Sequence, residues 1–304
     1  MALALLVPGG NGQLGRELAL RASDTISVTA PGSAELDITN AGAVVEAVKA
    51  LVESAQATGA RPVLVNAAAY NAVDAAEADS TPAFAVNGEG PRLLAAACAA
   101  NQVPLIHIST DYVFAGDSTD RRPYEADDVT RPLSAYGASK RAGEEAVLGS
   151  GAEGWVVRTS WVYGAYGKNF VKTMARLAGE HPTVSVVDDQ YGSPTWTGDL
   201  ASGLIELADR VSGANPPAQR LLHCTGSGEA TWYQFAAAVF TELGHDADRV
   251  IPCKTEEMRR PAPRPMYSVL SDKAWREAGL TPMPSWRSAL STAFAKDGSH
   301  FRTP

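Results

Sequence analysis

The sequence has few cysteines and no long apolar run, and these shortages argue against several classes of protein. Its three cysteines are scattered and form no Cys-x-x-Cys pair, so neither a disulfide framework nor a zinc site is indicated. No stretch approaches the roughly 18 apolar residues that a transmembrane helix needs. The apolar start lacks a basic segment and meets Gly9 and Gly10 at once, which does not fit a signal peptide. We therefore expect a cytoplasmic protein without membrane contact.

Metal ligands and basic surface are also scarce. The five histidines show no His-x-x-x-His spacing, so we expect no catalytic metal. The net charge of −8 argues against a nucleic-acid partner, which would need a broad basic surface. It does not exclude one anionic ligand held by local amides and arginines.

The first half of the chain alternates short apolar runs with longer helical patterns. Strands are predicted at 2–7, 26–29, 62–66, 104–108 and 155–160, and helices at 13–21, 40–57, 82–101 and 134–148. Strands that alternate with helices pair in parallel through right-handed crossovers. The pattern therefore predicts an α/β fold with a doubly wound parallel sheet of the Rossmann type.

After Ser160 this rhythm loosens. Helices are predicted at 169–178, 197–211, 231–243 and 286–294, with proline-rich connections between them. The chain of 304 residues is long enough for about two lobes. We expect a dinucleotide-binding lobe over 1–160, rejoined by part of 190–226, and a smaller, mostly helical substrate lobe over 161–304.

A glycine-rich loop, Gly9–Gly15, follows the first predicted strand. Its candidate cofactor-binding residues are Gly9, Gly12, Gln13, Leu14 and Gly15. Glycines permit the tight turn and let the backbone approach a pyrophosphate at the start of the next helix. A plain glycine-rich turn is the simpler alternative. The position between a strand and a helix favours the dinucleotide site.

The tip of the second predicted strand, 30–33, contains no acid to bind a ribose 2′-hydroxyl and no arginine. Arg16, just after the last glycine of the loop, is a candidate partner for a 2′-phosphate. The sequence therefore leans toward NADPH and leaves NADH open.

Tyr136 and Lys140 are spaced to lie one turn apart on the same face of a helix. A phenol has a pKa of about 10 and is a poor acid, and a neighbouring ammonium group eases proton donation to a ketone oxygen. The spacing alone is common, and a surface pair is the simpler alternative.

Other strand ends supply counterparts to Tyr136. Thr110 follows the fourth strand, where a hydroxyl is placed to bond the same carbonyl, and Asn66 and 67–70 follow the third. Open α/β sheets place ligands at this edge. Three strand ends thus converge on one predicted site.

These residues resemble those of the extended, sugar-nucleotide-modifying short-chain dehydrogenases/reductases. The matching segments are 9–15, 36–39, 66–70, 73–74, 76–77, 86–87, 109–114, 136–140, 158–164, 169–170, 189–195, 232–233 and 264–265. The resemblance covers nearly the whole chain and thins after about 270. It implies NADPH or NADH as cofactor and reduction of the C4 ketone of a nucleotide-linked sugar.

The resemblance also implies roles for individual residues. The catalytic set is Thr110, Tyr136 and Lys140. The cofactor contacts, besides the glycine loop, Tyr136 and Lys140, are Asp37 and Ile38 beside the adenine and Ala67, Ala68, Ala69 and Tyr70 along the groove. The sugar contacts are Thr110, Asp111, Tyr112, Trp161 and Asn169, although Trp161 also fits a core aromatic. A structural, non-catalytic Mg²⁺ contact at Glu17 stays open.

The chain departs from the family pattern at three positions near the site. Pro8 and Asn71 each stand where threonine is usual, and Ala115 replaces an acid. None is expected to touch the proton donor, but Asn71 and Ala115 leave the substrate preference open.

Three other roles remain as alternatives. A dehydratase is disfavoured because Asp111 is followed by Tyr112 rather than a second acid, whereas an epimerase is less well excluded. A non-catalytic regulatory subunit is disfavoured by the intact set of threonine, tyrosine and lysine. The sequence does not determine the oligomeric state, and a homodimer stays open.

Polar residues outside this set have simpler interpretations. His107 is expected to be buried with its hydrogen bonds satisfied, and Asp74 and Glu77 are expected to be charges near a helix N-terminus. The arginines at 259, 260 and 264 fit either a solvated linker or a diphosphate pocket.

Overall fold

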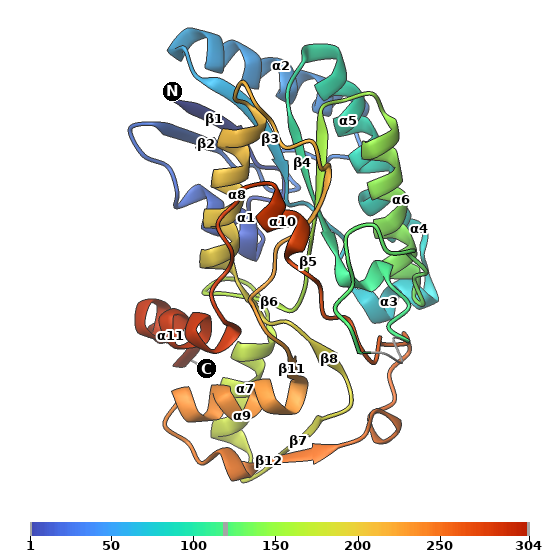
Figure 1. The fold of residues 1–304 in the computed structure, drawn as a ribbon, viewed down its shortest axis with the longest axis vertical. Coiled ribbons are helices and arrows are strands. Elements are labelled where there is room, and N and C mark those ends of the chain that lie inside the picture. Colours follow the sequence, from blue (N-terminus) through green and yellow to red (C-terminus); the bar gives the residue numbers. More distant parts are fainter. Residues whose placement is uncertain (1, 118–120, 303–304) are drawn as a thin grey trace.

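The computed structural model describes residues 2–117 and 121–302, which form a larger lobe built on a sheet and a smaller lobe below it (Figure 1). The sheet has six strands in the order β10-β5-β4-β3-β1-β2. These strands are β1 (Leu3–Leu6), β2 (Ile26–Thr29), β3 (Arg61–Asn66), β4 (Leu105–Thr110), β5 (Gly154–Thr159) and β10 (Leu221–His223). All neighbouring strands pair in parallel. The predicted doubly wound parallel sheet is confirmed.

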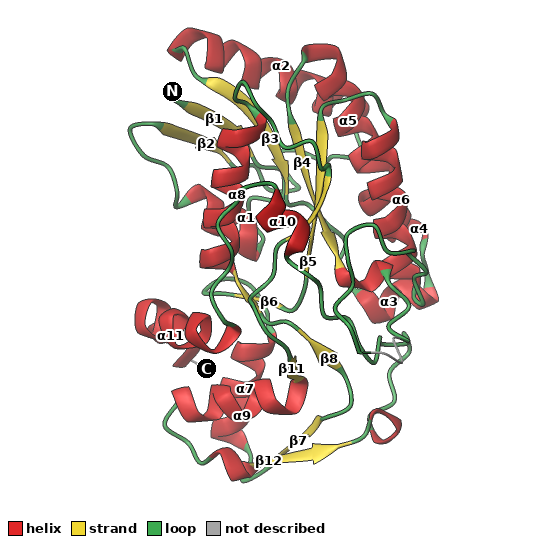
Figure 2. Cartoon of the chain, viewed as in Figure 1, coloured by secondary structure: helices red, strands yellow, loops and turns green. Residues whose placement is uncertain are grey.

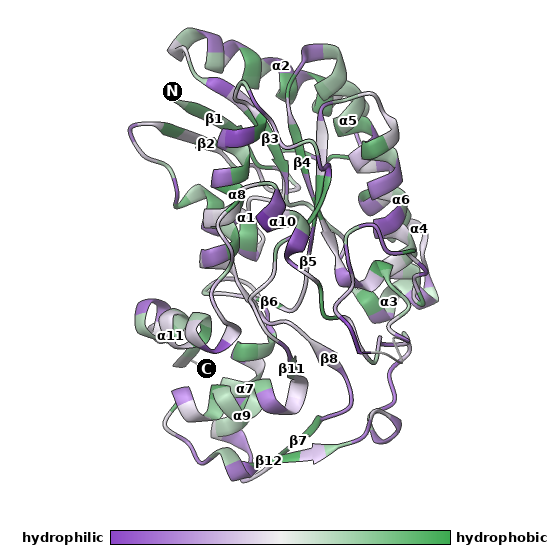
Figure 3. Ribbon diagram, in the orientation of Figure 1, coloured by the Kyte–Doolittle hydropathy of each residue, from purple (hydrophilic) through white to green (hydrophobic). Residues whose placement is uncertain are grey.

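Helices cover both faces of this sheet because its strands are apolar on both faces (Figures 2 and 3). Alternate residues of β1 show this: Leu3 and Leu5 join one core cluster, and Ala4 and Leu6 join the other. The first cluster is closed by α1 (Gln13–Ala19), α8 (Thr197–Val211) and α10 (Lys273–Glu277). The second is closed by α2 (Ala41–Thr58), α5 (Gly90–Asn101) and α6 (Ala135–Gly149).

The smaller lobe has its own apolar core around Phe235 and Phe240. Its helices are α7 (Phe170–Glu180), α9 (Trp232–Glu242) and α11 (Trp286–Arg302). Three two-stranded pairs accompany them: β7 (Val184–Val187) with β12 (Val250–Cys253), β8 (Tyr191–Gly192) with β11 (Ala230–Thr231), and β6 (Val162–Tyr163) with β9 (Thr195–Trp196). Within the ranges that the structure describes, no helix is long and apolar enough to cross a bilayer.

The predicted helix 82–101 was wrong as a single element. It begins as α4 (Thr81–Phe84), loosens into a π-helical turn η1 (Ala85–Glu89) and continues as α5. Asn87 lies in this turn, and its side chain bonds the backbone N–H and C=O of Tyr70 at 2.8 and 3.0 Å. A π-helical turn of this kind is frequent at functional sites.

Several short elements were not predicted. They include α3 (Val73–Ala78), the 3₁₀ turns η2 (Asp111–Val113), η3 (Ala247–Arg249) and η4 (Thr255–Glu257), the helix α10 and the short strands from β6 to β12. The last helix, α11, also runs farther than predicted, to Arg302.

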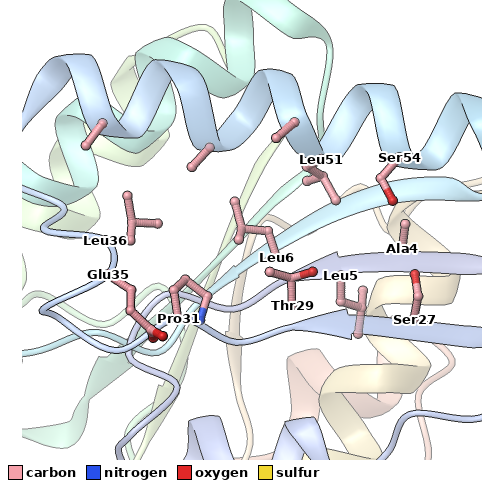
Figure 4. Close-up of a pocket in the computed structure, with 13 residues that line it drawn as sticks. Ala4, Leu5, Leu6, Ser27, Thr29, Pro31, Glu35, Leu36, Leu51 and Ser54 are labelled. Atoms are coloured by element: carbon pink, nitrogen blue, oxygen red, sulfur yellow. The ribbon is translucent and has the colours of Figure 1, made fainter.

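A groove of about 390 Å³ lies between α2 and two strands of the sheet, the edge strand β2 and its neighbour β1 (Figure 4). The helix faces it with small side chains, including Ala43, Ala47 and Ser54. Ser27 and Thr29 of β2 line the opposite wall. Small side chains on both walls leave this space unfilled.

Candidate active site

The predicted threonine and tyrosine meet at the carboxyl end of β4. Thr110 ends that strand, and Tyr136 lies in the first turn of α6, which Ser134 begins by accepting a hydrogen bond from Gly137 N at 3.1 Å. Burial raises the pKa of Tyr136, and the neighbouring Thr110 hydroxyl acts in the opposite direction. The phenol is therefore protonated at neutral pH, as a proton donor must be.

Lys140 lies one turn after Tyr136 and is buried. Its Nζ donates to the carbonyl of Ile108 in β4 at 2.7 Å. Burial lowers the pKa of Lys140 to about 8, while the charge of Glu144 acts to raise it. Glu144 itself forms a buried ion pair with Arg158 of β5 at 2.7 Å. The helix that carries Tyr136 and Lys140 is thus fixed to the sheet through charged groups.

The glycine loop makes a turn that larger residues could not enter. Gly9 has φ +87°, and a Cβ on it would lie 2.6 Å from Ala68 N. A Cβ on Gly15 would lie 2.3 Å from Gly9 O, and one on Gly10 would lie 1.8 Å from Ala30 O. Gly12 caps α1 without any side-chain hydrogen bond, which leaves the first helical amides available to an anion. This loop fits a dinucleotide pyrophosphate.

The end of β3 forms the next wall of the groove. Asn66 Nδ2 bonds His107 Nδ1 at 3.1 Å, and its Oδ1 accepts from Ala68 N at 3.1 Å. His107 is fully buried, but its Nε2 has no partner among the described residues, so the expectation of a satisfied histidine was half right. Ala67 N bonds Pro8 O at 3.1 Å. The segment 67–70, which includes Ala69, is held between the glycine loop and the π-helical turn.

Three other predicted cofactor residues lie apart from these contacts. The side chain of Leu14 packs in the sheet core. Asp37 accepts bonds from the backbone and hydroxyl of Thr39 at 2.9 and 2.8 Å. Ile38 is buried against Gly90.

The glycine loop reaches the smaller lobe through Gln13. Its side-chain oxygen accepts from Asn169 Nδ2 at 3.0 Å, while Asn169 Oδ1 caps α7 by accepting from Lys172 N at 3.0 Å. Arg16 lies over the ring of Tyr166 at 5.5 Å. Asn169 therefore links the predicted cofactor and sugar sides.

Trp161 joins the two lobes in a left-handed backbone conformation, with φ +47°. Its indole stacks on Trp232 with ring centroids 3.5 Å apart. It also lies against Gly192, where an added Cβ would meet the indole at 2.4 Å. A residue other than glycine held at positive φ is uncommon and is often found at functional sites.

A cavity of about 360 Å³ opens beside these aromatics. Tyr112, Phe170 and Trp232 line it together with Arg260 and Arg264. Of the three arginines considered from the sequence, these two therefore face a cavity. Arg264 also pairs at 2.9 Å with Asp74, in the first turn of α3.

Asp111 is 2% exposed, although the sequence placed it at the sugar. Thr110 Oγ1 donates to Asp111 Oδ1 at 3.0 Å, and Ser268 Oγ donates to Oδ2 at 2.6 Å. Burial raises the pKa of Asp111 to about 6, and these two bonds act to lower it. Tyr112 follows directly and packs edge-to-face on Tyr136.

A comparison with known proteins identifies the family to which this chain belongs. The model of the RmlD substrate binding domain family matches residues 3–298. The chain belongs to this family.

Named relatives of this RmlD-family chain are similar over most of their length. The dTDP-4-dehydrorhamnose reductase of Streptomyces griseus is 47% identical over 291 residues, which cover 95% of this chain and 92% of the relative. A probable dTDP-4,6-dihydroxy-2-methyloxan-3-one 4-ketoreductase of Streptomyces antibioticus is 45% identical, with 95% and 94% covered. A crystal structure of dTDP-4-dehydrorhamnose reductase from Bacillus anthracis in complex with NADP has a TM-score of 0.87 and 35% identity, with 97% of this chain and 100% of that chain covered. The family resemblance seen in the sequence is confirmed.

Sequence reasoning missed two contacts in this RmlD-family site. Tyr136 Oη lies 3.5 Å from Asn71 Oδ1 and donates a weak bond to it, so the expectation that Asn71 would not touch the proton donor was wrong. Ser268 was not considered, because nothing local marks a serine 157 residues from Asp111 as its partner.

Glu17 is buried and pairs with Arg21 at 3.0 Å. Burial raises the pKa of Glu17. In residues 2–117 and 121–302, no three His, Cys, Asp or Glu side chains form a group that could hold a metal ion.

Proposed function

We propose that the chain reduces the C4 ketone of dTDP-4-dehydro-L-rhamnose with NADPH, giving dTDP-L-rhamnose for surface polysaccharide. The observation that carries this proposal is the buried, protonated tyrosine beside Thr110, at the edge of the sheet where the glycine loop also lies. The names of the relatives support the choice of sugar.

The loop 9–15 and the segment 67–70 would hold the dinucleotide, and Lys140 would bind its ribose. When bound, NADPH supplies the hydride. Tyr136 gives its proton to the ketone oxygen, and Lys140 and Thr110 stabilise the phenolate that remains. Asp37 and Ile38 would lie beside the adenine.

The cavity beside Tyr112 suits the nucleotide part of the substrate. Phe170 and Trp232 offer apolar faces to a base. Arg260 and Arg264 offer guanidinium groups to a diphosphate. Trp161 and Asn169 would then lie on the sugar side, close to Thr110, Asp111 and Tyr112.

In this scheme residues 1–160 with part of 190–226 bind the cofactor, and the remainder of 161–304 binds the substrate. We place the reaction in the cytoplasm, where nucleotide sugars and NADPH are made.

The sequence leaves open whether the protein is a homodimer. Light scattering would measure its mass in solution and test this.

The test is a panel of dTDP-linked 4-keto sugars, with loss of NADPH or NADH absorbance as the readout. We expect turnover of the rhamnose precursor, and modestly tighter binding of NADPH than of NADH. A panel is needed because a 44% identical relative from Streptomyces niveus is named dTDP-4-keto-6-deoxy-D-glucose reductase. Lack of turnover with every sugar would contradict the proposal and favour a regulatory subunit.

A further inference from the structure

A chain of buried hydrogen bonds runs from the C-terminal part of the sequence to Thr110, which lies beside the proposed proton donor. Ser268 Oγ donates to Asp111 Oδ2 at 2.6 Å, and Thr110 Oγ1 donates to Asp111 Oδ1 at 3.0 Å. The Thr110 hydroxyl is close enough to Tyr136 to lower the pKa of its phenol. Ser268 is therefore linked through Asp111 to Thr110, the neighbour of Tyr136.

Backbone bonds fix the position of Ser268. Its N–H donates to Tyr191 O at 2.8 Å, and Tyr267 N donates to Gly116 O at 3.1 Å. Pro265 packs so closely on Gly116 that a Cβ there would lie 2.1 Å from the proline. Ser268 is 1% exposed. The hydroxyl is thus held at Asp111 by the loop after β4 and by β8.

The hydroxyl of Thr110 has one proton to donate. In this structure Asp111 accepts it, and Tyr112 N donates to the same hydroxyl oxygen at 3.2 Å. Once Tyr136 has given up its proton, the phenolate is a second acceptor for the Thr110 proton. If Thr110 turns toward it, the buried carboxylate of Asp111 loses a donor, which is costly unless another remains.

We propose that Ser268 is a positioning residue of the reduction, which keeps Asp111 satisfied so that the Thr110 hydroxyl can turn to the Tyr136 phenolate. The inference rests on the proposed function. The only bonds that change are those of the reduction itself. The Tyr136 O–H bond breaks and its proton joins the ketone oxygen, which takes up the π pair of the C=O bond. The hydride that bound NADPH would supply leaves a C–H bond of the cofactor and joins the ketone carbon. Thr110 keeps its proton and only reorients.

The titration of Asp111 can be distinguished from that of the groups around it. Its titratable neighbours are tyrosines: Tyr112 on its own turn, Tyr136 from α6, and Tyr191 and Tyr267 around Ser268. Arg264 and Asp74 act on Tyr112 from beyond it. Lys140, whose pKa is about 8, titrates in every variant. Its contribution therefore cancels when kcat of a variant is divided by kcat of the parent at the same pH.

The decisive variant is Ser268→Ala, with kcat and KM measured from about pH 5.5 to 8. Loss of the donor raises the pKa of Asp111, by about one unit. At the alkaline end Asp111 is ionised and retains the Thr110 proton, so we expect kcat to fall about tenfold with KM nearly unchanged. At the acid end Asp111 is neutral and no longer holds the Thr110 hydroxyl, so the ratio of the variant's kcat to the parent's should return toward one.

Ser193→Ala is the matched control. Ser193 is equally buried, but its hydroxyl donates to Gly228 O at 2.8 Å, and we expect no pH-dependent ratio. Ser268→Cys keeps the shape with a weaker donor and should show the same trend at smaller size. If the alanine variant does not fold, the cysteine variant is compared with the parent in its place.

A ratio that does not vary with pH, or that Ser193→Ala reproduces, would overturn the role of Ser268. NMR titration of the Asp111 carboxyl carbon gives a readout without turnover, and an unchanged midpoint in Ser268→Ala would overturn it too. Failure of the proposed function is seen separately, as a parent protein that reduces none of the sugars.

Discussion

Tyr136 is the residue on which the proposed chemistry depends most directly. Its hydroxyl meets Thr110 and Asn71 at the cleft. In Tyr136→Phe we expect kcat to fall about 10²–10⁴-fold, because the alkoxide formed by hydride transfer loses its positioned proton donor. Steady-state kinetics measures this loss. Circular dichroism and NADPH titration should match the parent, and near-normal turnover with cofactor bound would rule the mechanism out.

Glu144 shows how a structural charge supports the catalytic helix. It is buried with Arg158, the two side chains being 5% and 3% exposed. Glu144→Gln leaves the Arg158 guanidinium buried without its counter-charge, so the free energy of unfolding should drop by about 3–5 kcal/mol. The next residue, Glu145, pairs with Arg141 at the surface. Glu145→Gln should cost less than about 1 kcal/mol, and equal losses in urea unfolding of the two variants would refute this difference.

At the scale of elements, α2 packs loosely on the edge of the sheet. Ala47 faces the groove of about 390 Å³, so Ala47→Leu should bury new apolar surface there and stabilise the fold by about 0.5–2 kcal/mol. Thermal unfolding measures the gain. Ala57→Leu, at an exposed position of the same helix, controls for helix propensity and should change little. A lower melting temperature for Ala47→Leu would mean that the groove cannot accept the side chain.

Elements whose own residues carry the apolar period were predictable. The strand 26–29 and the helix 197–211 were predicted with the bounds that β2 and α8 have. β10 has only three residues, and pairing with β5 rather than its own pattern makes it a strand. α10 is nearly as short. The break at η1 depends on Asn87 bonding Tyr70, a contact that no local pattern announces.

The same distinction holds inside the site. Where a residue lies at the end of a predicted helix or strand, the sequence indicates both its chemical type and its place in the fold. This holds for Thr110, Tyr136 and the glycine loop. Ser268 reaches Asp111 only because a loop after β4 and strand β8 hold it there. Glu144 did carry a signal, since it follows Lys140 at the same four-residue spacing that joins Tyr136 and Lys140.

The stability of the whole molecule should depend on pH through two buried histidines. Burial lowers the pKa of His223 to about 3 and holds that of His107 well below its usual value. In the unfolded chain both titrate near about 6.5. Their contribution to the free energy of unfolding is therefore complete above about pH 6.5. It is lost as the pH falls toward the pKa values that the histidines have in the folded protein. Asp111, with a pKa raised to about 6, takes up its proton in the folded state and offsets part of this loss below pH 6.

We expect each histidine to contribute a slope of about 1.4 kcal/mol per pH unit in that window. His223→Gln removes one of the two, so its free energy of unfolding should fall less steeply between about pH 6.5 and 4.5. Urea unfolding across this range provides the slopes. Parallel lines for parent and variant would show that His223 does not remain neutral in the folded protein.

The sixth strand of the sheet has a consequence for synthesis on the ribosome. β10 pairs with β5 but is made about 60 residues later, so the nascent sheet has an open edge for about 3–12 s at ordinary elongation rates. α8, which helps to close one face, also arrives late. Nascent chains stalled after β5 should therefore be digested readily by protease, and chains stalled well past β10 should resist. Equal resistance at both lengths would mean that the first five strands are stable without their last neighbour.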